Sequence, residues 1–239
     1  MENNSLKNTL LIPVSIIIAG LAIGGALIFI KARGNANPAA AGVAVIHAED
    51  NTPAITAQDH ILGNPNAPVV LVEYADTDCP YCQAFLPTLH KIINQYGPSG
   101  QVAWVYRHFA FHPNAPKEAE ALECINEIGG NDKFWQYLDL LFSKKDFSQS
   151  PYVGIDRAQL PSLASTIGVD QTMFSTCLNS GKYKSKIDSE YNDAVKAGAQ
   201  GTPYTVIVTR TGKIPITSGA ISYDTLNNAI KALLNQTPQ

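Results

Sequence analysis

The chain has 239 residues and a formal net charge of −3 at neutral pH, with 45% hydrophobic and 15% charged residues. Because acidic and basic residues are interspersed, the composition argues against nucleic acid as a partner, which would need a basic surface. The length accommodates one folded domain of ordinary size together with flanking segments.

Residues 10–30 form an uncharged apolar run behind a short N-terminal tail, residues 1–9. At about 1.5 Å per residue, a helix of this length crosses a bilayer core of about 30 Å. The run exceeds the apolar part of a cleaved signal peptide, and no small-residue cleavage site follows it closely. We therefore expect a transmembrane signal-anchor, although the alanine-rich stretch at 39–48 keeps cleavage as an alternative.

The charges beside this run do not favour a cytoplasmic N-terminus, because Lys7 lies on one side and both Lys31 and Arg33 lie on the other. Residues 31–54 are rich in Ala, Asn, Gly and Pro without a sustained hydrophobic period, which is typical of a flexible tether. The folded domain is expected at residues 55–236.

The folded domain is predicted to begin with a strand, a helix and a second strand. Val69–Tyr74 is apolar apart from one acidic residue, and helical spacing of apolar residues follows as far as Tyr96. Gly97-Pro98 ends the helix, and Val102–Phe109 has strand composition. These pieces make a β-α-β unit with a parallel crossover.

Residues 113–198 show helical periodicity throughout, with Asp132 and Asp170 placed to cap helix N-termini. Thr205–Val208 then returns to strand composition, and a tight turn, a partner strand at Ile214–Thr217 and a closing helix complete the chain. The predicted fold is α/β, with a mixed sheet and an inserted helical subdomain over one end.

Cys79-Pro80-Tyr81-Cys82 stands where the first strand feeds the helix. Unpaired backbone N–H groups and the positive end of the helix dipole stabilise a thiolate at Cys79, and Pro80 suits the first helical turn. A small disulfide ring is possible, so Cys79 can exchange with a partner's sulfur and Cys82 can resolve the mixed disulfide. The motif predicts a redox-active dithiol.

A zinc site that includes Cys124 and Cys177 is the alternative, but these two lie far apart in sequence, unlike the close second pair of typical zinc sites. A purely structural bridge within the motif is disfavoured, because so short a loop removes little chain entropy. His108 and His112 are interpreted as satisfied or solvated histidines. We expect no metal and no other cofactor.

Glu73 lies inside the first apolar strand, where an acidic side chain is expensive to bury unless it is hydrogen-bonded or protonated. It is either a functional buried carboxyl or a strand-end residue that reaches solvent.

With these residues, the chain resembles the DsbA-like thiol oxidoreductases of the thioredoxin superfamily, which carry a helical domain inserted into the thioredoxin fold. The resemblance rests on the Cys79–Cys82 motif, Glu73 six positions before it, the helical insertion, and Gly201-Thr202-Pro203 before the late strand.

The resemblance implies a role for each of these residues. Cys79 is the nucleophile, Cys82 the resolving thiol, and Glu73 a buried proton acceptor for Cys82. Thr202-Pro203 matches the cis-proline loop that offers backbone groups to a substrate peptide; an ordinary trans bond is the alternative.

Some DsbA-like proteins have a second disulfide in the helical domain, and Cys124 with Cys177 looks similar. Such a bridge would constrain the unfolded chain by about 4 kcal/mol. Two small buried side chains that never meet are the alternative.

Tyr81 departs from the most strongly oxidising members, which have histidine there, so a less extreme oxidant is expected. The resemblance implies a membrane-anchored, extracytoplasmic enzyme that introduces disulfides into exported proteins with free thiols and is reoxidised by a membrane redox partner. A reductase or isomerase on the same fold, and a redox-inactive peptide-binding module or chaperone, are the alternatives. A monomer is the default expectation.

Overall fold

The computed structural model describes residues 51–148, 154–216 and 219–236. The predicted signal-anchor and nearly all of the predicted tether lie outside the described residues. Within the described ranges, none of the helices has the length and apolar character needed to span a bilayer.

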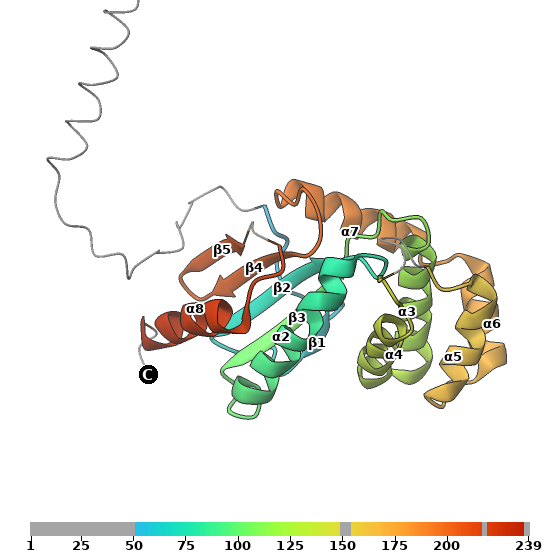
Figure 1. Ribbon diagram of the computed structural model, residues 1–239, viewed down its shortest axis with the longest axis horizontal. Coiled ribbons are helices and arrows are strands. Elements are labelled where there is room, and N and C mark those ends of the chain that lie inside the picture. The colour runs from blue at the N-terminus through green and yellow to red at the C-terminus, as the bar shows by residue number, and fades with distance from the viewer. Residues whose placement is uncertain (1–50, 149–153, 217–218, 237–239) are drawn as a thin grey trace, which may run out of the picture. The chain divides into compact units, whose positions relative to one another are not determined.

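A mixed five-stranded sheet forms the centre of the domain, with strand order β1-β3-β2-β4-β5 (Figure 1). Only β2 and β3 are parallel, and the other neighbours are antiparallel. The strands are β1 (His60–Leu62), β2 (Val69–Ala75), β3 (Val102–His108), β4 (Tyr204–Thr209) and β5 (Gly212–Ile216). The α/β class and mixed sheet are confirmed. Strand β1 was not predicted from the sequence, because its three residues are too few to show a period.

Strand β2 is buried along its whole length because helices cover both faces of the sheet. Its residues alternate between the faces, as the strand period requires. Val69 and Leu71 belong to the core shared with α2 (Pro80–Tyr96) and α8 (Tyr223–Gln236). Val70 and Val72 belong to the opposite core, which includes Ala194 of α7 (Lys184–Lys196).

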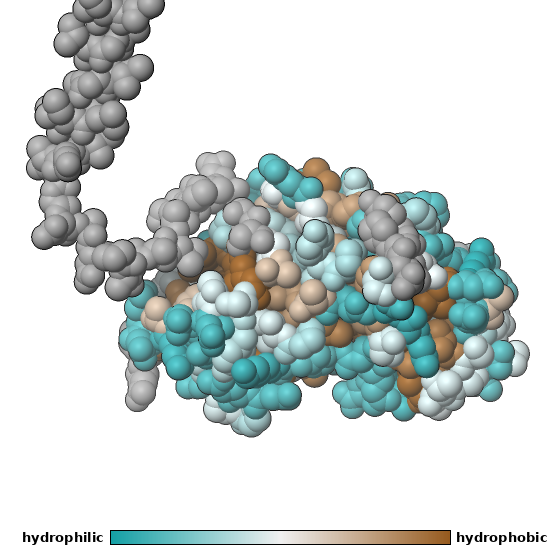
Figure 2. Space-filling view, viewed as in Figure 1, coloured by the Kyte–Doolittle hydropathy of each residue, from teal (hydrophilic) through white to brown (hydrophobic). Residues whose placement is uncertain are grey.

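The predicted helical insertion is confirmed between β3 and β4, and α3 to α6 lie together at one side of the sheet (Figure 1). Its helices are α3 (Ala115–Gly129), α4 (Asn131–Ser143), the 3₁₀ turn η1 (Arg157–Gln159), α5 (Leu160–Thr166), α6 (Gln171–Ser180) and α7. Hydrophilic side chains cover much of the visible surface over α8, while apolar atoms show between helices of the insertion (Figure 2).

The two helix caps predicted in the insertion have different outcomes. Asp170 caps α6, since its carboxylate accepts the backbone N–H of Met173 at 2.8 Å. The prediction for Asp132 is wrong, because α4 already begins at Asn131 and Asp132 lies in its first turn. Gly130 takes the cap position with φ at 79°, a value that favours glycine and lets α3 turn directly into α4.

A disulfide joins Cys124 of α3 to Cys177 of α6. It closes a sequence separation of 53 residues within the insertion. A crosslink over a loop of this size restricts the unfolded chain by about 4 kcal/mol on the chain-entropy model. The four-thiolate zinc alternative is thereby excluded in this structure, because two of its sulfurs are bonded to each other.

Candidate active site

The two cysteines of the motif lie at the junction of β2 and α2. Cys79 is the N-cap of α2, with φ −92° and ψ 121°, and Pro80 is the first helical residue. The backbone N–H of Cys79 donates to the carbonyl of Asp76 at 3.1 Å, which fixes the turn between strand and helix. Both thiols are free and nearly inaccessible, whereas Tyr81 between them is 67% exposed.

The pKa of the Cys79 thiol is lowered from 9.0 to about 6. The largest cause is the hydrogen bond from the thiol of Cys82, while burial acts in the opposite direction. Hydrogen bonding from the side chain of Thr202 and from the backbone N–H groups of Cys82 and Tyr81 lowers the pKa further. The contributing backbone groups are those that the first turn of a helix leaves unpaired. Cys79 is therefore largely a thiolate at neutral pH.

The pKa of the Cys82 thiol is raised well above its ordinary value. Complete burial is the main cause, followed by the hydrogen bond that the thiol gives to Cys79 and by the negative charges of Cys79 and Glu73. The two sulfurs of one motif thus have opposite protonation at neutral pH. Cys79 is the acidic member and Cys82 keeps its proton.

Glu73 is 2% exposed and lies in the middle of the sheet, so the alternative of a strand end open to solvent is wrong. Because side chains alternate along a strand, Glu73 points to the same face of β2 as Val69 and Leu71, which is the face covered by α2. Its carboxyl accepts the indole N–H of Trp104 at 3.0 Å. Burial raises its pKa to about 8, and this rise exceeds the lowering caused by the Trp104 hydrogen bond.

The Thr202–Pro203 peptide bond is cis and lies against the dithiol. The thiol of Cys79 is 3.3 Å from the carbonyl oxygen of Thr202, which accepts a hydrogen bond from it. Antiparallel pairing of β2 with β4 sets Tyr74 opposite Tyr204 and thereby carries the loop to the end of β2. The sheet register, and not proximity in sequence, brings these residues together.

A buried ionic cluster beside the dithiol was not predicted from the sequence. The ammonium of Lys145 lies 2.5 Å from a carboxylate oxygen of Asp78 and 2.5 Å from one of Glu118, and it donates to the carbonyl of Thr77 at 2.8 Å. Asp78 directly precedes Cys79, so the cluster ties the active-site turn to the insertion. Two acidic residues just before the motif, Asp76 and Asp78, were the available signal, but nothing in the sequence pairs either with Lys145.

The carboxylate of Asp76 fixes the chain that enters the insertion. One of its oxygens accepts the backbone N–H groups of Phe111 and His112 at 2.8 and 3.0 Å. The His112 ring also contacts this carboxylate at 3.0 Å, whereas His108 bonds to Glu123 elsewhere. His108 and His112 therefore belong to different clusters.

Comparison with known proteins places this geometry in a family. Residues 56–232 match a family profile described as Thioredoxin. The chain belongs to the thioredoxin family. The resemblance inferred from the motifs is confirmed at the level of family and fold.

Among solved structures, this thioredoxin-family chain resembles oxidised BdbD from Bacillus subtilis with a TM-score of 0.65 and 23% identity, over 74% of this chain and 93% of that one. It also resembles DsbA2 from Pseudomonas aeruginosa with a TM-score of 0.61 and 24% identity, over 78% of this chain and 100% of that one. These likenesses show the DsbA-like form of the thioredoxin fold.

Among curated proteins, the Na⁺/H⁺ antiporter NhaA of Herminiimonas arsenicoxydans is 30% identical over 145 residues, which is 61% of this chain and 21% of that protein. An NhaA 3 of Salinispora tropica is 32% identical over 149 residues. The chain spans about a fifth of the length of the curated relatives it matches.

Proposed function

We propose that the chain is a thiol-disulfide oxidoreductase that introduces disulfides into exported proteins through Cys79 and Cys82. The observation that carries the proposal is the opposite perturbation of the two thiols. The pKa of Cys79 falls to about 6 and that of Cys82 rises. A dithiol with one acidic and one protonated sulfur suits stepwise exchange, because the acidic sulfur is the better leaving group.

The reaction begins with the oxidised Cys79–Cys82 pair. A substrate thiolate attacks the sulfur of Cys79, the bond to Cys82 breaks, and the departing Cys82 sulfur takes up a proton. A second substrate thiolate then attacks the substrate sulfur of the mixed disulfide, and Cys79 leaves as a thiolate. The substrate has lost two electrons to the dithiol, which a membrane redox partner then reoxidises.

Glu73 supplies and recovers the proton of Cys82 in this proposal. With a pKa of about 8 it is mostly protonated at neutral pH, and in its ionised form its negative charge raises the pKa of the Cys82 thiol. A carboxyl whose pKa lies near the working pH is suited to both directions of proton transfer. Thr202, whose carbonyl faces Cys79, offers its backbone to the substrate segment that carries the attacking thiol.

The acidity of Cys79 favours the reduced form of the enzyme and so favours disulfide donation. Lowering the pKa of Cys79 from 9.0 to about 6 makes the thiolate the main form at pH 7 and stabilises the reduced enzyme there by about 1.4 kcal/mol, which corresponds to about 30 mV for a two-electron couple. This stabilisation of the reduced enzyme therefore supports electron flow from the substrate thiols to the dithiol, which makes the chain a disulfide donor.

We further propose that residues 10–30 anchor the chain in the membrane with the catalytic domain on the extracytoplasmic side. Support comes from the uncharged run itself and from the Cys124–Cys177 bridge, since structural disulfides persist in oxidising compartments. Exported proteins with free thiols then share the compartment of the dithiol.

The deciding experiment is the reduction potential of the Cys79–Cys82 couple, measured by equilibration with glutathione and thiol trapping, with Cys124 and Cys177 scored separately by mass. A value well above about −200 mV supports a disulfide donor, and one near about −270 mV contradicts it and indicates a reductase. Cys79→Ala is expected to abolish oxidation of a reduced substrate protein. Substrate oxidation that survives this change would overturn the proposal.

A further inference from the structure

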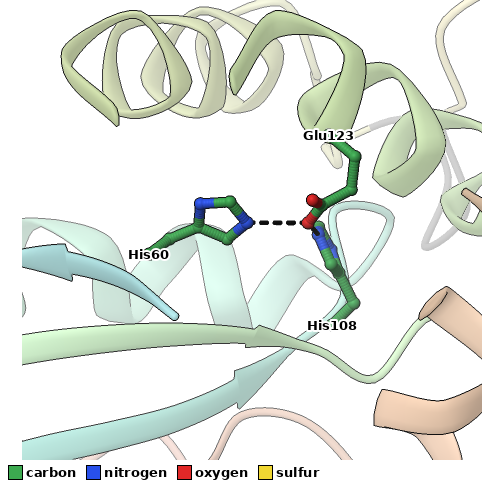
Figure 3. A group of neighbouring side chains, drawn as sticks. All are labelled: His60, His108 and Glu123. Carbon is green, nitrogen blue, oxygen red and sulfur yellow. Dashed lines mark hydrogen bonds and ion pairs between the residues drawn. The ribbon is translucent and has the colours of Figure 1, made fainter. Parts of the chain in front are cut away.

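A second cluster of chemically reactive side chains is buried where the sheet meets the insertion. His60 of β1 and His108 at the end of β3 both direct their rings toward the carboxylate of Glu123 on α3 (Figure 3). The Nε2 atoms lie 2.7 and 3.0 Å from the same oxygen, Oε1. All three residues are at most 3% exposed, and the thiol chemistry described above uses none of them.

We propose that His60, His108 and Glu123 form a binding site for a transition-metal dication of the Zn²⁺ class. Two imidazoles and one carboxylate make a common ligand set for zinc, with the fourth position left to water. Imidazole nitrogen favours zinc, nickel, copper or iron over calcium and magnesium, which prefer oxygen ligands. The donor set therefore selects this class of ion.

The spacing of the three donor atoms suits such an ion. They lie within 4.8 Å of one another, and ligands of a tetrahedral zinc with bonds of about 2.0 to 2.1 Å lie about 3.3 Å apart. The separations of 2.7 and 3.0 Å between Oε1 and the nitrogens need to widen by only a few tenths of an ångström. The two nitrogens, which lie within 4.8 Å of each other, need to come to a similar distance. The ion would replace two hydrogen bonds, while the proton on each ring moves to Nδ1.

The rings are held in place before any ion arrives. His60 stacks on Phe134 with ring centroids 3.6 Å apart and planes 9° from parallel. His108 lies between Tyr106 and Phe134 in edge contacts, and its backbone N–H donates to Glu190 at 2.7 Å. Ligands whose orientation is fixed by their neighbours lose little freedom on binding.

A pocket borders the cluster. A pocket of about 290 Å³ lies elsewhere in the insertion, but the one of about 650 Å³ has His60 and Glu123 in its wall. Its other lining includes the polar side chains of Asn126, Asn131 and Tyr183. Water from this pocket can fill the fourth ligand position, so the site does not depend on a fourth side chain.

Lys186 is the competitor that the ion must displace. Its ammonium lies 3.1 Å from Oε1 of Glu123 and also pairs with Glu190, four residues along α7. Because Glu190 remains as a partner, Lys186 can leave Glu123 without becoming an unpaired buried charge. Removal of this lysine charge is therefore expected to strengthen metal binding.

A bound ion would join β1 and β3 of the sheet to α3 of the insertion. His108 pairs in register with Ala75, the last residue of β2 before the active-site turn. The site would thus fasten the insertion to the sheet close to the dithiol without contacting it. Because the metal would bind the folded chain and not the unfolded one, the free energy of unfolding should rise with the logarithm of the metal concentration.

The test uses the full chain without an affinity tag, in mild detergent, with Cys79–Cys82 oxidised so that neither sulfur can bind metal. Zn²⁺ is titrated against a chromophoric chelator, and Co²⁺ is added separately for its visible absorption. We expect one equivalent to bind and intense Co²⁺ bands typical of a tetrahedral site. His60→Gln and Glu123→Gln are expected to weaken binding by more than about 10-fold, and Lys186→Met to tighten it.

His90→Gln is the matched control, because His90 also pairs with a carboxylate, Asp139 at 2.8 Å, outside the cluster. The affinity of the His90→Gln variant for Zn²⁺ should equal that of the unaltered chain. Binding weaker than about 100 μM in the oxidised chain, or equal loss in all three histidine and glutamate variants, overturns the proposal. If a cluster variant does not fold, absence of the Co²⁺ bands in the unaltered chain decides against the site. Neither result bears on the reduction potential of the dithiol.

Discussion

Replacing Glu73 with glutamine tests the electrostatics of the buried strand. The pKa of Glu73 is about 8 in the folded chain and 4.5 in its ordinary state. Because the folded state holds the proton more tightly, the free energy of unfolding falls as the pH rises from about 4.5 to about 8. Between pH 5 and pH 8.5 this one carboxyl should remove about 4 kcal/mol of stability, and Glu73→Gln should abolish that part of the pH dependence.

The glutamine variant keeps a carbonyl for the indole N–H of Trp104 but adds a buried amide donor. At pH 5 we expect it to be less stable than the unaltered chain by about 1 to 3 kcal/mol, the cost of an unpaired buried group. At pH 8.5 the order should reverse. The crossing of the two stability curves is a sharper sign of the raised pKa than either value alone.

Denaturant unfolding of the disulfide-oxidised chain at several pH values measures these differences, since the oxidised sulfurs of Cys79 and Cys82 do not titrate. Oxidation removes only the smallest cause of the raised pKa, the charge of Cys79, and leaves the burial of Glu73 unchanged. Asp224→Asn, a change at an exposed carboxyl in the first turn of α8, is the control and should leave the slope unaltered. If Glu73→Gln and the unaltered chain lose the same stability between pH 5 and pH 8.5, the carboxyl is ionised in the fold and the proton-transfer role fails.

Three further changes have defined outcomes. Tyr81→His adds an imidazole beside the Cys79 thiolate and should raise the reduction potential by about 30 mV for each tenfold gain in thiolate stability, as measured by glutathione equilibration; an unchanged potential would contradict the helix-turn electrostatics. The double change Cys124→Ser and Cys177→Ser should lower the free energy of unfolding by about 4 kcal/mol, and a loss below about 1 kcal/mol would show a constrained unfolded state. Lys145→Met leaves two buried carboxylates unpaired and should cost about 3 to 5 kcal/mol, measured by denaturant unfolding; a neutral effect would mean that these carboxylates are protonated.

The helices and strands whose apolar residues recur with a regular period could be predicted from the sequence. Strand β2 and helix α2 follow from the runs on either side of Cys79, and the insertion follows from helical spacing in residues 113–198. Strand β1 was missed because three residues carry no period and its pairing with β3 is the only thing that defines it.

The long-range contacts of the site were not accessible in the same way. Lys145 meets Asp78 across 67 positions, and His60 meets Glu123 across 63. No local pattern encodes such pairs, because they depend on how the insertion packs on the sheet. The dithiol itself was found since its chemistry lies within four adjacent residues, 79–82.

The position of the Thr202 carbonyl beside Cys79 has a consequence for the chain during its own synthesis. The two residues are 123 positions apart, and the helix turn and the buried carboxyl that act on the thiols also exist only after folding. In a newly made chain Cys79 is an ordinary cysteine among four. The contact with Thr202 forms only once β4 has paired with β2, so the complete environment of the Cys79 sulfur depends on the folded sheet.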